Sequence, residues 1–191
     1  IHMYKFRKIL QIIAYYILPI TLLILAFGKT EREVFTKLGN TSLILLSLIV
    51  FIKPLAVIFK KKFLWNIVSL RRELGVANFW TFFFHFTGLY YVNSLTPRAI
   101  FNPDYFIFWG AMAGIGMIIL SVSANNFSTR LLKKNWKRLH YITYPVFLFA
   151  LYHGSKAQDE IVNFYVGASV FIILKIIEFT IKHKKSKQKI T

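Results

Sequence analysis

Six long apolar stretches, divided by short segments in which Lys and Arg gather, constrain this chain more than any other feature. A transmembrane helix needs roughly 20 mostly apolar residues to cross a hydrocarbon core of about 30 Å. Of the 191 residues, 56% are hydrophobic and only 17% are charged. The sequence therefore predicts an all-α integral membrane protein, with six transmembrane helices bundled into a single domain over residues 1–191. The expected helices cover about 9–27, 41–59, 76–95, 105–122, 138–153 and 161–181.

The distribution of basic residues predicts the orientation of this bundle. Eighteen of the 25 Lys and Arg residues lie in the N-terminal segment, the 60–72 and 130–138 segments and the C-terminal tail, all on one side of a six-helix topology. Because cytoplasmic loops carry the excess of Lys and Arg, both termini are expected in the cytoplasm. This topology also accounts for the net charge of +18. The expected partner is therefore membrane lipid, and no nucleic acid is expected.

Three of the five histidines lie in or at the membrane, and two of them share a depth. His85 is 13 residues past Arg72, His153 is 15 past Arg138, and the two expected helices run in the same direction. At about 1.5 Å per residue, their depths differ by about 3 Å. Two neutral imidazoles so placed suit the axial positions of one haem iron. Zinc fits less well, since it usually takes three or four protein ligands. In the alternative interpretation, each histidine only hydrogen-bonds a neighbouring helix.

His140 lies near the cytoplasmic surface, beside a basic cluster and Trp136. The expected helix at 76–95 offers no histidine at that depth; the residues nearest to it are Arg71 and Arg72. His140 is therefore either a ligand of a second haem with an unidentified partner, or part of a site for a flavin such as FMN or for a quinone. An interfacial histidine without a cofactor is the third interpretation.

Three further patterns predict local structure. Gly110 and Gly114 are four residues apart and favour close helix packing. Lys175 and Glu178 are three apart on one helix and are expected to form an ion pair. The chain has no cysteine, which excludes disulfides, Cys-ligated zinc and iron–sulfur clusters.

Several motifs occur together in an order that resembles a known family. Lys53-Pro54-Leu55-Ala56 closes the second expected helix, and Arg71-Arg72-Glu73-Leu74-Gly75 precedes the helix that holds His85. Trp136-Lys137-Arg138-Leu139-His140, followed by His153, is the most specific signature. The chain resembles the ferric-reductase-like transmembrane family, most of all the small haem-binding membrane subunits of bacterial periplasmic methionine sulfoxide reductase systems. The likeness is clearest from about residue 35 to 180.

The resemblance implies a function in electron transfer across the bacterial inner membrane. It implies b-type haem, one or two per chain, with His85, His153 and His140 as the candidate metal ligands. Arg71 and Arg72 would hold a flavin phosphate or a haem propionate. Electrons would come from a cytoplasmic flavin, flavin reductase or quinol. They would pass to a periplasmic molybdenum-containing methionine sulfoxide reductase subunit, so no residue of this chain is assigned as catalytic.

Two alternatives to this function remain at the level of the sequence. One is a stand-alone ferric or oxygen reductase membrane domain fed by a soluble flavoprotein, because the chain shows no Gly-rich dinucleotide fingerprint of its own. The outer-face pair Gly154-Ser155, where the family carries a bulkier stretch, leaves the acceptor open. The other alternative is a haem-free helical transporter or scaffold, in which the histidines only pack helices.

Overall fold

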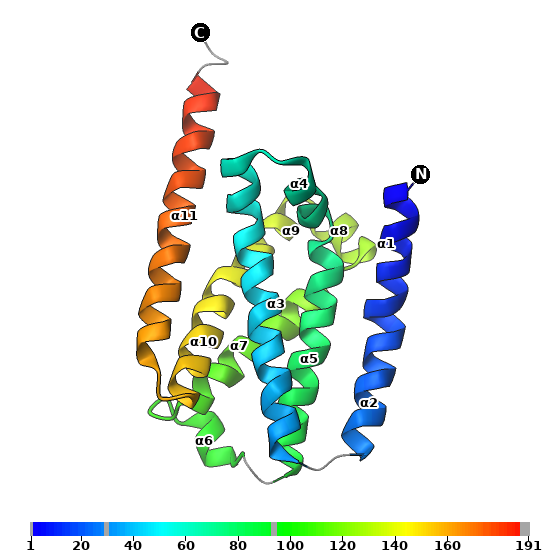
Figure 1. The fold of residues 1–191 in the computed structure, drawn as a ribbon, viewed down its shortest axis with the longest axis vertical. Helices are drawn as coiled ribbons and strands as arrows, with labels where there is room; N and C mark the ends of the chain where they lie inside the picture. The colour runs from blue at the N-terminus through cyan, green and yellow to red at the C-terminus, as the bar shows by residue number, and fades with distance from the viewer. Residues whose placement is uncertain (1, 29–30, 93–94, 188–191) are drawn as a thin grey trace.

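The computed structural model describes residues 2–28, 31–92 and 95–187, and every regular element within them is a helix (Figure 1). This confirms the all-α prediction. In chain order the elements are α1 (His2–Ile12), the π-helix η1 (Ile13–Ile17), α2 (Leu18–Gly28), α3 (Arg32–Phe59), α4 (Lys62–Ser69), α5 (Arg71–Tyr91), α6 (Pro97–Phe101), α7 (Phe106–Val122), α8 (Asn126–Leu132), α9 (Lys134–Leu139), the 3-10 helix η2 (His140–Ile142), α10 (Thr143–Ala157) and α11 (Ile161–Lys187).

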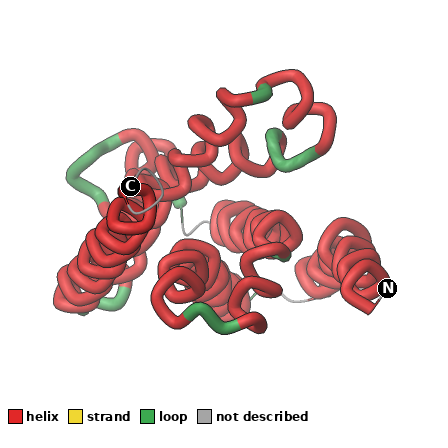
Figure 2. The backbone as a smooth tube through the Cα atoms, turned by 90° about the horizontal axis from the view of Figure 1, so that it is seen from above, coloured by secondary structure: helices red, strands yellow, loops and turns green. Residues whose placement is uncertain are grey.

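Helix α3 lies at the centre of the arrangement. It packs on α5, on α10 and on α11, while α10 packs mainly on α7. The N-terminal helices lie at the edge against α5, and Figure 2 shows them on the opposite side of the bundle from the C-terminal helix. The core between α3, α7, α10 and α11 is apolar. Its buried members include Leu46, Val50, Val146, Phe147 and Phe171.

The number of helices that qualify as membrane spans is smaller than the six expected. Among the described residues, three helices are long and apolar enough: Phe6–Leu25, Arg32–Phe59 and Ile161–Lys184. A fourth span results if α7 and α8, which are bent by 91° relative to each other, are counted together. Helices α5 and α10 are not among them. The apolar residues of α5 are interspersed with Asn, Thr, His, Trp and Tyr, which lower its mean hydropathy, and α10 has only 15 residues.

The expected polar loop before residue 41 is largely helical, because α3 begins at Arg32. The polar side chains of this segment find hydrogen-bond and ion-pair partners within the helix itself. The hydroxyls of Thr36 and Thr41 donate to the carbonyls four residues earlier, at 3.1 and 2.9 Å, and Glu33 pairs with Lys37 at 2.7 Å. Low hydropathy therefore marks a polar helical extension and not a loop. Residues 29–30 of the expected loop lie outside the described residues.

Other expected boundaries also differ. Helix α5 begins at Arg71 rather than 76 and ends at Tyr91; residues 93–94 of the expected 76–95 helix lie outside the described part. The expected 138–153 helix is divided, because η2 precedes α10, which continues to Ala157. Pro145 explains the division, since its ring lacks an N–H and crowds the carbonyl of Tyr141. Short helices also occupy the segments between the expected helices: α4 follows the second expected helix, and α8 and α9 follow the fourth.

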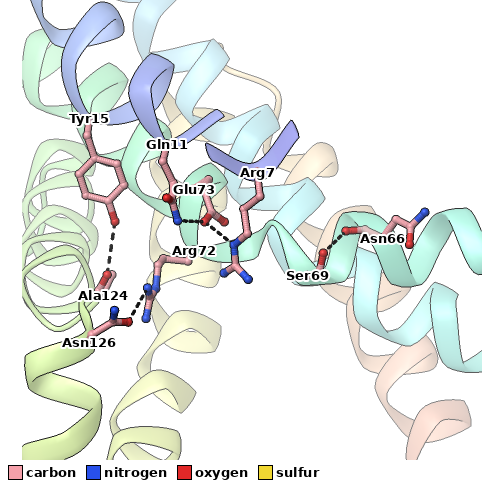
Figure 3. A network of polar contacts seen from close by, with 9 residues as sticks. All are labelled: Arg7, Gln11, Tyr15, Asn66, Ser69, Arg72, Glu73, Ala124 and Asn126. Carbon is pink, nitrogen blue, oxygen red and sulfur yellow. Dashed lines mark hydrogen bonds and ion pairs between the residues drawn. The ribbon is translucent and has the colours of Figure 1, made fainter. Parts of the chain in front are cut away.

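The first expected helix is interrupted by the π-helix η1. Pro19 follows it, and its ring crowds the carbonyl of Tyr15, which disfavours regular α-helical bonding there. Before this interruption, Arg7 and Gln11 each donate to Glu73 Oε1 of α5 at 2.9 Å (Figure 3). Glu73 is 2% exposed. A buried polar clamp thus holds the N-terminal helix against α5.

Candidate functional site

The imidazoles of His85 in α5 and His153 in α10 lie side by side. Their ring centroids are 6.3 Å apart and the ring planes meet at 66°. The two helices that hold them pack mainly on other neighbours, α5 on α3 and α10 on α7. The two side chains therefore meet across a space between helices.

A backbone carbonyl fixes each ring. His85 Nδ1 lies 2.7 Å from the carbonyl oxygen of Phe35 in α3, and His153 Nδ1 lies 3.0 Å from that of Phe106 in α7. A carbonyl oxygen only accepts, so in both rings Nδ1 carries the proton and donates it. A neutral imidazole protonated at Nδ1 keeps its lone pair on Nε2. Histidine ligands of metals are commonly held by such a second hydrogen bond.

Each imidazole also lies against a glycine of a neighbouring helix. A Cβ atom on Gly39 of α3 would come within 2.6 Å of His85 Nδ1. A Cβ atom on Gly110 of α7 would come within 2.8 Å of His153 Nδ1. Both distances are shorter than real Cβ contacts. Small residues at these two positions are therefore required for the rings to lie where they do, and the spacing that predicts helix packing at Gly110 also supports the His153 site.

A cavity of about 190 Å³ opens beside the two rings. Its interior is mostly apolar, with Phe82, Phe86 and Leu89 of α5 among its lining residues. Exposed polar side chains line its rim: Arg32, Asn40 and Gln158. We refer to this space as the His85–His153 cavity.

The donor set at this cavity fits haem iron. Metal–nitrogen bonds of about 2.0 Å, with about 1.1 Å from a ring nitrogen to the ring centre, place the centroids of two opposed imidazoles about 6 Å apart. The observed separation is 6.3 Å. Two imidazole ligands complete an iron whose other four positions are filled by a porphyrin. No group of three or more His, Asp or Glu side chains suited to a metal ion occurs within residues 2–28, 31–92 and 95–187.

The structure places His140 elsewhere, in a second cavity of about 330 Å³. We refer to this space as the His140 cavity. The ring of His140 stacks on Trp136, with centroids 4.0 Å apart, and its Nε2 lies 3.4 Å from Ser123 Oγ. His140 and the pair His85–His153 line no common cavity. The structure thus brings two of the three candidate histidines together and separates the third.

Positive charge surrounds the His140 cavity. Its lining includes four cations and, among the described residues that line it, no carboxylate. The cations are Lys53, Arg71, Arg72 and Lys137. Arg71 Nε is buried without a hydrogen-bond partner in the described part of the chain, while Arg72 donates to Asn126 Oδ1 at 2.9 Å (Figure 3). Buried charge that lacks a partner is costly, so this cavity suits an anionic ligand.

Several site residues carry no signal in the sequence. Met117 lines both cavities, and its Sδ accepts from Asn78 Nδ2 at 3.2 Å. Ser42 Oγ in turn donates to Asn78 Oδ1 at 2.7 Å. All three are at least 95% buried, so this polar chain forms part of the wall between the cavities. Buried Ser and Asn inside apolar helices are the only hint that the sequence offered.

A second missed residue is Tyr144, which lines the His140 cavity. Its hydroxyl accepts from Lys175 Nζ of α11 at 2.8 Å. Lys175 also pairs with Glu178 at 2.8 Å, which confirms the ion pair that their spacing predicts. The link to Tyr144 crosses between two helices, and sequence spacing within one helix does not predict it.

Residues 38–151, more than half of the chain, match the family described as Ferric reductase like transmembrane component. The matched segment contains His85 and His140 and stops two residues before His153. No solved structure matches the chain.

One curated relative is the protein-methionine-sulfoxide reductase heme-binding subunit MsrQ of Agrobacterium fabrum (strain C58), 28% identical over 146 residues. The alignment covers 71% of this chain and 65% of that relative, so the chain spans less than two thirds of the relative's length. The family match and the helices that qualify as membrane spans lead to one conclusion. This chain is a multi-pass membrane protein that belongs to the ferric reductase like transmembrane component family.

Proposed function

We propose that this protein is a membrane cytochrome that holds haem b between His85 and His153. The observation that carries the proposal is the pair of neighbouring imidazoles, each fixed through Nδ1 by a backbone carbonyl and so left with the lone pair of Nε2 to bind a metal. Bound haem iron supplies one-electron chemistry, alternating between its ferric and ferrous states. The name of the relative MsrQ, a heme-binding subunit, agrees with this.

The residues of this chain hold and shield that group. Phe35 and Phe106 fix the ring orientation through their carbonyls, and Gly39 and Gly110 leave room for the rings. The apolar lining excludes water, and Arg32 at the rim offers a cation to a propionate. Burial and axial ligation are the terms by which a protein sets a haem potential.

The topology we propose is a six-helix bundle in the bacterial inner membrane, with both termini in the cytoplasm. The described ends of the chain lie at the same end of the molecule as α4, α8 and α9, the short helices of the basic segments (Figure 1). An excess of Lys and Arg at one end is typical of the cytoplasmic side. The His140 cavity, with its lining cations, then opens towards the cytoplasm and the His85–His153 cavity towards the periplasm.

Electrons would cross in that direction. We propose that a cytoplasmic flavin, flavin reductase or quinol donates at the His140 cavity, where Arg71 and Arg72 hold its anionic groups. His140 would ligate a second haem if haem occupies that cavity, and would contact the donor if a flavin or quinol occupies it. The acceptor would be a periplasmic methionine sulfoxide reductase subunit with a molybdenum centre, because the relative MsrQ is named as a subunit of a protein-methionine-sulfoxide reductase.

A second candidate is a stand-alone ferric or oxygen reductase, fed by a soluble flavoprotein. The family description, a ferric reductase component, favours it. The two candidates differ in the acceptor. A membrane preparation that reduces ferric chelates or oxygen in the absence of any periplasmic protein supports the second. Dependence on a periplasmic reductase subunit supports the first.

The test of haem binding is the reduced-minus-oxidised visible spectrum of the purified protein, expressed with ample haem. We expect a b-type band in the wild type that is lost in both His85→Ala and His153→Ala. His183→Ala, at an exposed histidine near the end of α11, is the matched control and should keep the band. A colourless wild type would overturn the proposal in favour of a haem-free transporter or scaffold.

A further inference from the structure

The proposed electron donor must release protons as well as electrons. The inference drawn from this rests on the proposed function. A hydroquinone or dihydroflavin that gives up two electrons also gives up two protons, whereas haem iron accepts electrons alone. Each two-electron oxidation in the His140 cavity therefore leaves two protons there. The cavity is already lined by cations, so it favours their removal.

A chain of hydrogen bonds leads out of the His140 cavity. Tyr144 of α10 lines the cavity, and its hydroxyl oxygen accepts from Lys175 Nζ at 2.8 Å. Lys175 Nζ lies 4.5 Å from the centre of the Tyr144 ring and donates to Glu178 Oε2 at 2.8 Å. Lys182 donates to the other oxygen of Glu178, and its side chain is 49% exposed. The chain thus runs from the cavity wall to the surface at the basic end of α11.

The burial of this network sets it apart from surface ion pairs. Glu178 is 3% exposed, although most of the described side chains of α11 are exposed. Ionisable groups within membrane helices are costly, and proton relays are among the functions that they mark. Among the described residues, Lys53 of α3 and Arg71 of α5 are the cations of other helices that lie near this network. The carboxylate of Glu178 is therefore the proton acceptor to which the hydrogen-bonded chain from the cavity leads.

We propose that Tyr144, Lys175 and Glu178 form a proton exit from the His140 cavity. Lys175 passes a proton to the Glu178 carboxylate, and Glu178 releases it to water beside the half-exposed side chain of Lys182. The neutral amine of Lys175 then takes the hydroxyl proton of Tyr144, whose oxygen takes a proton from the donor O–H or N–H. Two such passages remove both protons of one hydroquinone, and haem held by His85 and His153 would accept its two electrons one at a time.

The sharpest variant is Lys175→Arg. Arginine keeps the positive charge and can donate to both Tyr144 and Glu178, but it does not lose its proton in proteins. It therefore preserves the static network and blocks the relay. Tyr144→Phe and Glu178→Gln remove the first and last members. Glu33→Gln is the matched control, because it disrupts an exposed ion pair in α3.

The experiment compares two reductants on the purified haem protein. Menadiol and reduced FMN release protons on oxidation, whereas reduced methyl viologen gives one electron and no proton. We expect haem reduction by menadiol and reduced FMN to slow about tenfold or more in the three relay variants, in keeping with general acid–base contributions. Reduction by methyl viologen should not change. The wild-type rate with menadiol should fall in D₂O, and the rate with methyl viologen should not.

The outcomes separate this inference from the proposed function. Equal slowing with both classes of reductant would show that the network only packs α11, and unchanged rates with menadiol would exclude a relay; either result overturns the inference and leaves the haem site intact. A wild type without a haem band overturns both. If Lys175→Arg loses its haem band through misfolding, the same comparison on Tyr144→Phe decides the question.

Discussion

Gly110 of α7 lies directly against the imidazole of His153 in α10, where a Cβ atom would come within 2.8 Å of ring Nδ1. The neighbour is a ring held by its own hydrogen bond to Phe106, so it has little freedom to move aside. A single methyl group at this position is therefore a sensitive probe of the site. The same reasoning applies to Gly39 and His85.

We expect Gly110→Ala to displace the His153 ring and to lower the amount of haem that the protein retains, or to shift its visible spectrum. Gly167→Ala is the control, because a Cβ atom on Gly167 of α11 would crowd Leu151 Cδ2 at 2.7 Å and no histidine, and Gly167 lines neither cavity. Haem content per protein and the visible spectrum are the measurements. Full haem retention with an unchanged spectrum in Gly110→Ala would contradict the arrangement described for His153.

The clamp on Glu73 predicts an asymmetry between its two partners. Arg7→Met leaves the carboxylate of Glu73, whose side chain is 3% exposed, without its cation. Glu73→Gln leaves Arg7, whose side chain is 42% exposed and can reach water. We expect Arg7→Met to lose about 1–3 kcal/mol of unfolding free energy and Glu73→Gln to lose less. Thermal unfolding in detergent measures both, and the double variant should behave like Glu73→Gln.

The wall between the cavities predicts a stability effect at Asn78. Its amide joins Ser42 of α3 to Met117 of α7, and hydrogen bonds between membrane helices average about 0.6 kcal/mol each. We expect Asn78→Ala to destabilise the protein by about 1 kcal/mol or more, because two such bonds and the packing of the side chain are lost. Asn163→Ala, at an exposed position of α11, should have little effect. Equal melting temperatures for the two variants would count against this role.

The proposed orientation is testable because the chain has no cysteine, so single introduced cysteines are labelled uniquely. We expect a membrane-impermeant maleimide to label Arg98→Cys and Lys156→Cys in intact spheroplasts. Arg130→Cys and Lys61→Cys should react only after the membrane is permeabilised. The reverse pattern would place the His140 cavity on the periplasmic side and would reverse the proposed direction of electron flow.

The sequence predicts part of this site because depth in a membrane follows from residue count. His85 and His153 lie at similar distances along the chain from Arg72 and Arg138, 13 and 15 residues, and this spacing is enough to predict that they lie close together. Residue counts along the chain do not predict how each helix is rotated about its own axis. The carbonyl of Phe35, the glycine at 39 and the link from Tyr144 to Lys175 all depend on that rotation, and the sequence did not reveal them.

Helix ends were predictable only where apolar and polar residues separate cleanly. Helix α7 runs from Phe106 to Val122, close to the expected 105–122. Helix α3 begins nine residues before the expected boundary at 41, because its Thr hydroxyls and the Glu33–Lys37 pair satisfy polar groups inside the helix. Hydropathy measures how a residue partitions between water and lipid. It does not measure whether the backbone is helical.

The π-helix Ile13–Ile17 has a consequence for how sequences of this kind can vary in length. A π-turn is equivalent to one extra residue in an α-helix, and one residue corresponds to a rotation of about 100°. Deletion of one residue from this segment would remove the extra residue and turn the preceding residues by about that angle. Arg7 and Gln11 would then face away from Glu73. The contact of the N-terminal helix with Glu73 thus depends on the number of residues in the π-helix as well as on the side chains of Arg7 and Gln11.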